Sequence, residues 1–108
     1  MAREVTQETF AAAWADSALV VDVREADEYT AGHVPGARLM PLRSVPSRSG
    51  ELPTDRPVYV ICASGNRSRS AADWMTSRGV DAYSVTGGTA AWARDGRPIA
   101  AGSHEHAA

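Results

Sequence analysis

Runs of apolar residues that do not alternate with polar ones dominate the pattern of the chain. ALVVDVRE contains Val20, Val21 and Val23, and VYVIC extends from Val58 to Cys62. Such runs predict strands that are buried on both faces, as in the middle of a parallel sheet. ARLMPL and DAYSVTGG predict two further short strands, the first ended by proline and the second by two glycines.

Segments with helical spacing separate these strands. TQETFAAAWAD begins at a capping Thr6 and places Phe10 and Trp14 four residues apart on one face. RSRSAADWMTSRG carries apolar residues at helical spacing and ends at Gly79. The other expected helical segments are EADEYTAGH, stopped by Gly32, a turn within the proline-rich loop RSVPSRSGELPTDRP, and TAAWARDG.

The alternation of strands and helices predicts an α/β domain with a mainly parallel sheet and helices on both faces. A chain of 108 residues suits one compact domain, which we expect over residues 1–100. Residues 101–108 form a polar C-terminal tail, and its last segment, SHEHAA, is expected to fray. Ligands of such sheets bind beyond the carboxyl ends of the strands, where Cys62 is expected.

Composition and charge narrow the classes of function. The chain is 44% hydrophobic with a net charge of −2, which favours a globular protein that binds neither nucleic acid nor a membrane. No segment has the length and apolarity of a signal peptide or a transmembrane helix, so we expect a soluble cytoplasmic protein. One cysteine allows no internal disulfide, and no metal or organic cofactor is expected because three histidines and one cysteine form no ligand cluster.

The turn after Cys62, within VICASGNRSRS, carries the most specific chemistry of the chain. Small residues and Gly65 let the chain curl, and a curled turn before a helix directs N–H groups into one hollow. Arg67 adds a positive charge, so the hollow favours an anion such as the Cys62 thiolate. A cysteine at a strand end is often only a small buried hydrophobic residue, but the glycine and the two arginines, Arg67 and Arg69, favour a reactive thiol.

The size of the required pKa change shows which groups must act. A free thiol has a pKa of ~8.5, and a mostly ionised thiol at neutral pH needs stabilisation of about 2.7 kcal/mol. A helix dipole contributes only ~0.3–1 kcal/mol. Loop N–H groups bonded to the sulfur, together with Arg67, are therefore expected to supply the remainder.

Five motifs in order resemble the single-domain rhodaneses, a family of sulfurtransferases. They are VDVRE (21–25), GHVPGA (32–37), YVICASGNRS (59–68), SAADWM (70–75) and GGTAAW (87–92). Each motif alone is weak, whereas the ordered set is specific and spans about residues 4 to 98. The resemblance implies the rhodanese-like fold, a five-stranded, mainly parallel sheet with helices on both faces. It also implies a nucleophilic cysteine that carries sulfur as a persulfide.

The resemblance also assigns roles to residues. Cys62 corresponds to the catalytic nucleophile. The substrate-binding loop comprises Ala63, Ser64, Gly65, Asn66 and Arg67, with Arg67 facing the substrate, and the supporting residues are Asp22, Arg24 and Ser68. His33 is expected to brace a turn rather than act as a base. Gly87 and Gly88 are expected to allow close backbone approach, and Trp92 to lie in the core.

The implied reaction has two steps. The Cys62 thiolate takes the outer sulfur of a small anionic donor such as thiosulfate, and cyanide or a thiol removes it. A sulfur-relay carrier with a protein donor stays open as an alternative, and Ala63 and Ser64, which replace basic residues of some thiosulfate enzymes, leave the preferred donor open. A phosphatase of the same fold is disfavoured because four residues, not five, separate Cys62 from Arg67. A non-catalytic regulatory module is disfavoured because the cysteine is present.

Overall fold

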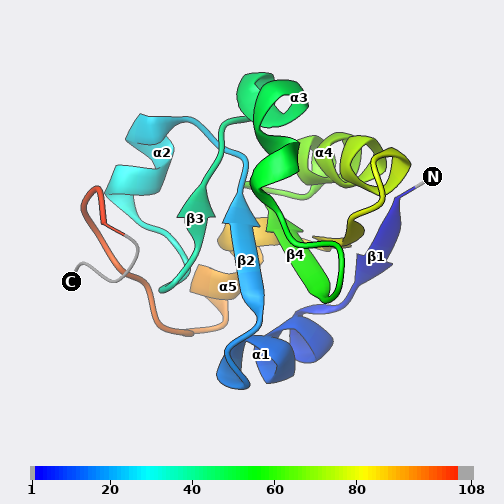
Figure 1. Ribbon diagram of the computed structural model, residues 1–108. Helices are drawn as coiled ribbons and strands as arrows, with labels where there is room; N and C mark the ends of the chain where they lie inside the picture. Colours follow the sequence, from blue (N-terminus) through cyan, green and yellow to red (C-terminus); the bar gives the residue numbers. More distant parts are fainter. Residues whose placement is uncertain (1, 105–108) are drawn as a thin grey trace.

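A five-stranded sheet forms the centre of the computed structural model, which describes residues 2–104 (Figure 1). The strands are β1 (Arg3–Val5), β2 (Leu19–Asp22), β3 (Arg38–Leu39), β4 (Pro57–Ile61) and β5 (Asp81–Val85). Their order across the sheet is β1-β5-β4-β2-β3, and every neighbouring pair is parallel. The prediction of an α/β fold with a parallel sheet is confirmed.

The helices follow the predicted segments. They are α1 (Gln7–Ala15), α2 (Ala26–Ala31), α3 (Val45–Arg48), α4 (Asn66–Ser77) and α5 (Gly88–Arg94), with 3-10 turns η1 (Leu42–Ser44) and η2 (Ser49–Glu51) on either side of α3. The Thr6 hydroxyl accepts a hydrogen bond from the Thr9 N–H at 3.1 Å, so α1 begins at the predicted cap. Within residues 2–104, no helix has both the length and the apolar character needed to cross a bilayer.

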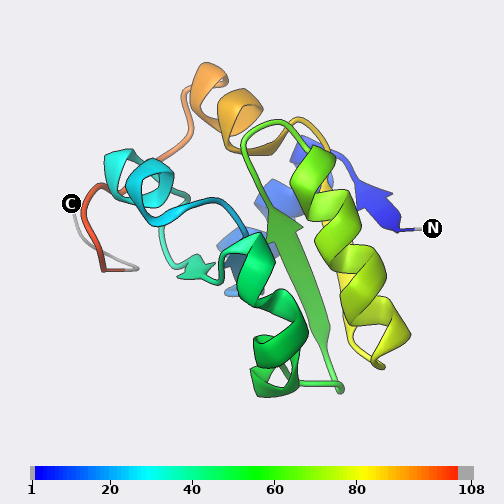
Figure 2. The same cartoon turned by 90° about the horizontal axis from the view of Figure 1, so that it is seen from above.

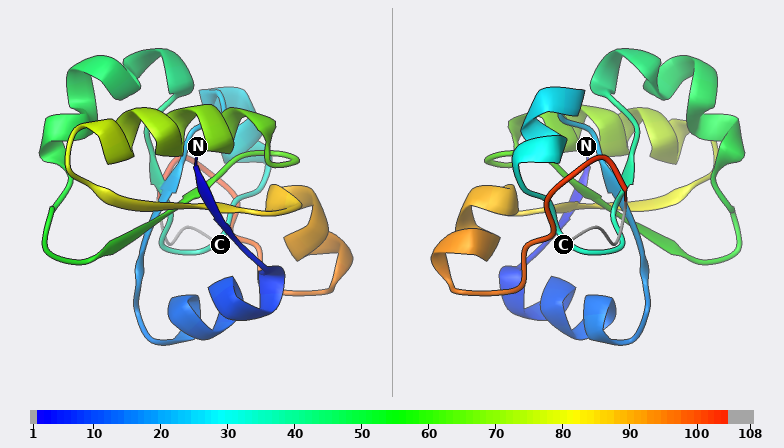
Figure 3. Two further views of the ribbon diagram at one scale, coloured as in Figure 1. Left: turned by 90° about the vertical axis from the view of Figure 1, so that its right-hand side faces the viewer. Right: turned by 90° about the vertical axis from the view of Figure 1, so that its left-hand side faces the viewer.

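Both faces of the sheet are covered, which explains the apolar runs of the central strands. Figure 3 shows α3 and α4 on one face and α1 and α5 on the other. Val60 of β4 packs in the cluster that contains Met75 of α4. Ile61, the next residue, packs in the cluster that contains Phe10 of α1 and Trp92 of α5. Successive side chains of the strand thus enter opposite cores, and the predicted core position of Trp92 is confirmed.

Strand β1 was not predicted from the residue pattern. It lies at the edge of the sheet, pairs only with β5, and exposes Arg3 and Glu4. The Arg3 guanidinium lies 4.1 Å from the centre of the Tyr83 ring and pairs with Asp81 at 2.6 Å. A short polar edge strand is stabilised by such cross-strand contacts, so it leaves no apolar run in the sequence.

The C-terminal segment packs against the end of α2 as far as the structure describes it. The backbone N–H of Gly102 donates to the Thr30 carbonyl oxygen at 2.8 Å, and His33 exchanges two backbone hydrogen bonds with Ala100. The His33 ring stacks on Tyr29 with centroids 3.7 Å apart, and its Nε2 lies 3.0 Å from the His104 carbonyl oxygen. His33 therefore braces this turn, as expected. Gly102 and His104 of the predicted tail are bonded to the domain, and residues 105–108 lie outside the described part.

The first turn of α5 approaches the turn after β4 more closely than a side chain would allow. Gly88 has φ +59°, and a Cβ there would lie 2.4 Å from the Cys62 carbonyl oxygen. The N–H groups of Thr89 and Ala90 donate to the carbonyl oxygens of Cys62 and Ala63 at 2.8 and 3.0 Å. The expectation that Gly88 allows close backbone approach is confirmed, and this contact fixes the backbone that carries the thiol.

We predict that Gly88→Ala destabilises the protein more than Gly96→Ala does. Both glycines have positive φ, but a Cβ added at Gly96 would have no atom within 4 Å, whereas one added at Gly88 would meet two carbonyl oxygens. Each variant incurs about 1 kcal/mol of backbone strain, and Gly88→Ala should lose about 2 kcal/mol more. Urea unfolding of both variants measures the difference, and equal losses would show that α5 can move away from the turn.

Candidate active site

Cys62 lies immediately after β4, where the chain turns into α4 at the carboxyl edge of the sheet. Figure 2 shows this turn between the end of β4 and the start of α4. The strand ends at Ile61, one residue earlier than predicted, and only 1% of Cys62 is exposed. The predicted nucleophile therefore occupies the ligand-binding edge of a parallel sheet.

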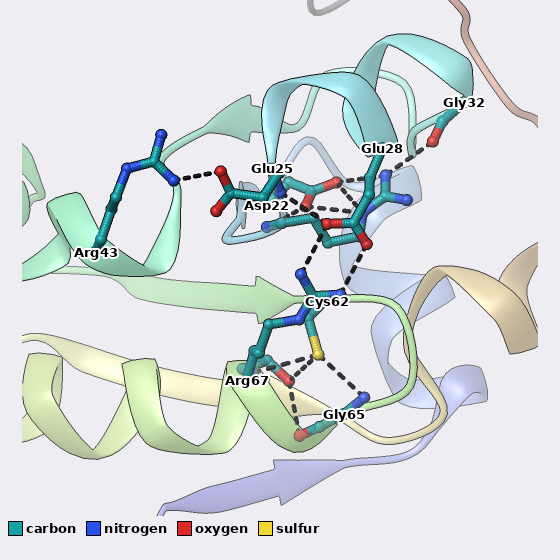
Figure 4. Close-up of polar contacts among 10 residues, drawn as sticks. Asp22, Glu25, Glu28, Gly32, Arg43, Cys62, Gly65 and Arg67 are labelled. Atoms are coloured by element: carbon teal, nitrogen blue, oxygen red, sulfur yellow. Dashed lines mark hydrogen bonds and ion pairs between the residues drawn. The ribbon is translucent and has the colours of Figure 1, made fainter.

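The sulfur is surrounded by hydrogen-bond donors from the turn and the first turn of α4 (Figure 4). Sγ accepts from the backbone N–H of Gly65 at 3.1 Å and from that of Ser68 at 3.3 Å. The Ser68 hydroxyl oxygen lies 3.5 Å from Sγ. Gly65 has φ +114°, a conformation that glycine adopts without strain, and this conformation lets its N–H face the sulfur.

Burial and hydrogen bonding act on the thiol in opposite directions. Burial raises the pKa of Cys62, but hydrogen bonds from the Ser68 hydroxyl and from the backbone N–H groups of Ser68, Gly65 and Ser64 lower the pKa below its ordinary value. The largest stabilising causes are therefore hydrogen bonds of the turn and of Ser68, rather than the charge of Arg67. The arrangement therefore increases the fraction of Cys62 that is present as the nucleophilic thiolate.

Ser84 on β5, which the sequence analysis missed, contacts the Ser68 hydroxyl that lies beside the Cys62 sulfur. Its hydroxyl on β5 lies 2.8 Å from the Ser68 hydroxyl, and both residues are fully buried. The Ser68 hydroxyl also lies 3.0 Å from the Gly65 carbonyl oxygen. The pair thus orients the hydroxyl that faces Cys62. The available signal was a small polar residue inside the apolar strand DAYSV, which by itself does not indicate a partner on α4.

The Arg67 guanidinium is paired with a carboxylate on α2 and is not a free positive charge in the turn. Its Nη1 and Nη2 donate to the two carboxylate oxygens of Glu28 at 2.7 and 2.8 Å. The same carboxylate accepts the backbone N–H of Glu25 at 2.9 Å, which caps α2. Hydrogen bonds from Arg67 above all hold the pKa of Glu28 at about 2, and this partner in turn raises the pKa of Arg67. Sequence reasoning missed Glu28, because the helix-start spacing of Glu25 and Glu28 reveals no partner on a distant helix.

The supporting pair Asp22 and Arg24 ties the end of β2 to the end of α2. Arg24 Nη2 lies 2.8 Å from Asp22 Oδ2 and 2.7 Å from the Gly32 carbonyl oxygen. Both charged residues are buried, at 0% and 6% exposure, so each needs the other. Their geometry fits the structural role that the resemblance implied.

The remaining residues of the predicted loop contribute differently. Ser64 and Asn66 are exposed, and Ala63 is half-buried. The Asn66 side chain accepts a hydrogen bond from Arg69 at 2.6 Å, so it is engaged on α4 rather than at the sulfur. Within residues 2–104, no group of three or more His, Cys, Asp or Glu side chains has an arrangement that could hold a metal ion.

Comparisons with known proteins agree with this geometry. The sequence profile of the Rhodanese-like domain matches residues 6–95. A protein named sulfurtransferase from Allochromatium vinosum is 36% identical over 104 residues, which cover 94% of this chain and 97% of the relative. A rhodanese-related protein from Thermoplasma volcanium superposes with a TM-score of 0.84 at 28% identity, covering 90% of this chain and 96% of that one. A rhodanese-like domain protein from Staphylococcus aureus superposes with a TM-score of 0.78 at 29% identity, covering 83% and 90%.

We predict that alkylation of Cys62 by iodoacetamide titrates with a midpoint below the free-cysteine pKa of ~8.5. Ser68→Ala should raise this midpoint, because it removes a side-chain hydrogen bond that lowers the pKa of the thiol. Asn66→Ala is the control, since the Asn66 side chain bonds to Arg69. A midpoint at or above the free-cysteine value in the unsubstituted protein would mean that burial outweighs the hydrogen bonds.

Proposed function

Because the chain belongs to the rhodanese-like domain family of sulfurtransferases, we propose that Cys62 carries sulfane sulfur as a persulfide. The donor is a small anion such as thiosulfate, and the acceptor is a thiol or cyanide. The observation that carries the proposal is the Cys62 sulfur facing the N–H groups of Gly65 and Ser68, with a pKa below the ordinary value. These donors stabilise the attacking thiolate and can stabilise an added sulfur in the same hollow.

The reaction balances without a cofactor. The Cys62 thiolate attacks the outer sulfur of thiosulfate, a sulfur–sulfur bond to Cys62 forms, and sulfite leaves with the electrons of the broken bond. An acceptor thiolate or cyanide then attacks the outer sulfur of the persulfide, and the Cys62 thiolate leaves. The chain holds no second cysteine that could form a disulfide with Cys62 and release the sulfur, so the acceptor comes from another molecule.

The proposal also includes a cellular compartment and a protein that could donate the sulfur. A single cysteine that must stay unpaired between cycles suits a reducing compartment such as the cytoplasm. A persulfide-bearing protein can replace thiosulfate as the donor, in which case the chain acts as a carrier in a sulfur relay. The two roles share the Cys62 persulfide and differ in which donor loads it faster.

We predict that thiosulfate raises the intact mass of the protein by one sulfur atom. Dithiothreitol should reverse the gain, because an added thiol is an acceptor for the persulfide. Cys62→Ser should show neither the mass gain nor thiocyanate formation from cyanide. Intact-mass spectrometry and a thiocyanate assay measure both, and sulfur transfer that survives in Cys62→Ser would exclude this residue as the nucleophile.

We predict that the protein does not hydrolyse aryl phosphates at a rate comparable to its sulfur transfer. A phosphate ester needs N–H groups around three oxygens and a guanidinium that closes the ring. Only four residues separate Cys62 from Arg67, and the terminal nitrogens of Arg67 are engaged by Glu28. Insertion of one glycine after Gly65 should open the hollow and lower sulfur transfer. Turnover of p-nitrophenyl phosphate equal to that of thiosulfate would overturn the assignment.

A further inference from the structure

Glu28 is the acidic side chain that compensates the one arginine of the active-site loop. Figure 4 shows Arg67 extending from α4 beside Cys62 toward Glu28 on α2. Both carboxylate oxygens are engaged, at 2.7 and 2.8 Å, and about a third of each side chain is exposed, 35% for Arg67 and 32% for Glu28. The pair thus lies within reach of solvent, where a donor anion would meet it.

Three other arginines also lie beside acidic side chains. Arg24 is held by Asp22, Arg43 is paired with Glu25, and Arg69 lies 3.9 Å from Glu4. Arg67 is the arginine of the turn itself, so attraction of a small anion to the turn depends mainly on Arg67, which must divide its hydrogen bonds between the sulfur donor and Glu28. A guanidinium that is already bound end-on by a carboxylate offers fewer N–H groups to a second oxyanion.

Glu28 is held in this position by more than Arg67. Its Oε2 also accepts the Glu25 N–H, so the capping of α2 fixes the carboxylate where Arg67 meets it. The ionised form persists across neutral pH because the pKa of Glu28 is about 2. A sulfur donor therefore always meets a carboxylate beside the guanidinium.

We propose that Glu28 is a positioning residue that acts through Arg67 and limits the use of dianionic sulfur donors relative to less charged ones. The inference rests on the proposed persulfide chemistry at Cys62 and names the donor class that this site favours. Repulsion between a carboxylate and a donor scales with the donor's charge, so thiosulfate suffers more than a monoanion. The neutral Arg67–Glu28 pair should therefore favour monoanionic thiosulfonates and persulfides over dianionic thiosulfate.

Two donors that differ mainly in charge test the proposal. Thiosulfate is a dianion, whereas methanethiosulfonate replaces one charged oxygen by a methyl group; Cys62 would attack the outer sulfur of either, releasing sulfite or methanesulfinate. With saturating cyanide, kcat/KM for each donor is measured in Glu28→Gln, in which one amide oxygen can still accept the Glu25 N–H. We expect a gain of about fivefold for thiosulfate and about twofold for methanethiosulfonate.

Matched variants separate this effect from a change in total charge or stability. Glu51→Gln removes the same charge from an ion pair between η2 and Arg48 of α3, and should leave the ratio of the two kcat/KM values unchanged. Figure 2 shows the η2 segment near the beginning of β4 rather than its end. In an Arg67→Gln background, Glu28→Gln should raise either kcat/KM by less than about twofold. If Glu28→Gln does not fold, Glu28→Asp serves instead, because its shorter side chain cannot hold both guanidinium nitrogens; it should change the ratio in the same direction by a smaller factor.

The outcomes distinguish the two proposals. No sulfur transfer from either donor would overturn the persulfide chemistry and the role of Glu28 together. Transfer from both donors with an unchanged ratio in Glu28→Gln would overturn only the role of Glu28. An equal rise in ratio in Glu51→Gln, or an undiminished rise in the Arg67→Gln background, would show that Glu28 does not act through Arg67 and would likewise overturn the inference.

Discussion

A thiolate that is buried loses its hydrogen bonds to water, and the protein must supply other hydrogen bonds in their place. The rest of the site depends on how this chain supplies them. Only 1% of Cys62 is exposed, and burial alone raises the pKa of the thiol. Two backbone N–H groups at 3.1 and 3.3 Å and one hydroxyl at 3.5 Å face the sulfur instead. The two N–H groups belong to the turn and to α4 itself, so they already face the sulfur before a sulfur-donating substrate binds.

The rest of the fold holds that turn in shape. The turn begins where β4 leaves the sheet, and α5 fixes its carbonyl oxygens through Thr89 and Ala90. Gly88 is required because a side chain would lie 2.4 Å from the Cys62 carbonyl oxygen. On the other side, the Arg67–Glu28 pair joins α4 to α2. Segments from three separate parts of the chain therefore determine one hollow around one sulfur atom.

Local patterns predicted the features that are determined locally. The apolar runs around Val21 and Val60 identified the two central strands, since their side chains enter cores on both faces. The position of Cys62 after such a strand, followed by small residues and a helix, predicted a thiol at the carboxyl edge of the sheet with N–H groups around its sulfur. The fifth strand, β1, came only from the resemblance to rhodaneses, because its polar residues depend on contacts with Tyr83 and Asp81 of β5.

Features that arise from long-range pairing were not predicted. The charge of Arg67 was expected to be free to attract an anion, yet its partner Glu28 is 39 residues away along the chain. Ser84 contacts Ser68 across a separation of 16 residues, from a strand onto a helix. Neither pairing leaves a periodic signal, because each depends on how two elements pack and not on the sequence of either element.

Different groups stabilise the Cys62 thiolate and carry the positive charge of the loop. Glu28 can therefore pair with Arg67 without removing the hydrogen bonds that lower the pKa of Cys62. Hydrogen bonds from neutral N–H and O–H groups are the largest causes that lower the pKa of Cys62, ahead of the charge of Arg67. Because nucleophilicity falls as the pKa of a thiol falls, moderate stabilisation by dipoles preserves more reactivity than a strong cation would. In the proposed function, Arg67 interacts with the sulfur donor, and Glu28 adjusts that interaction without altering the hydrogen bonds to the Cys62 sulfur. The two proposals together assign donor preference to one residue on α2 and the sulfur chemistry to Cys62.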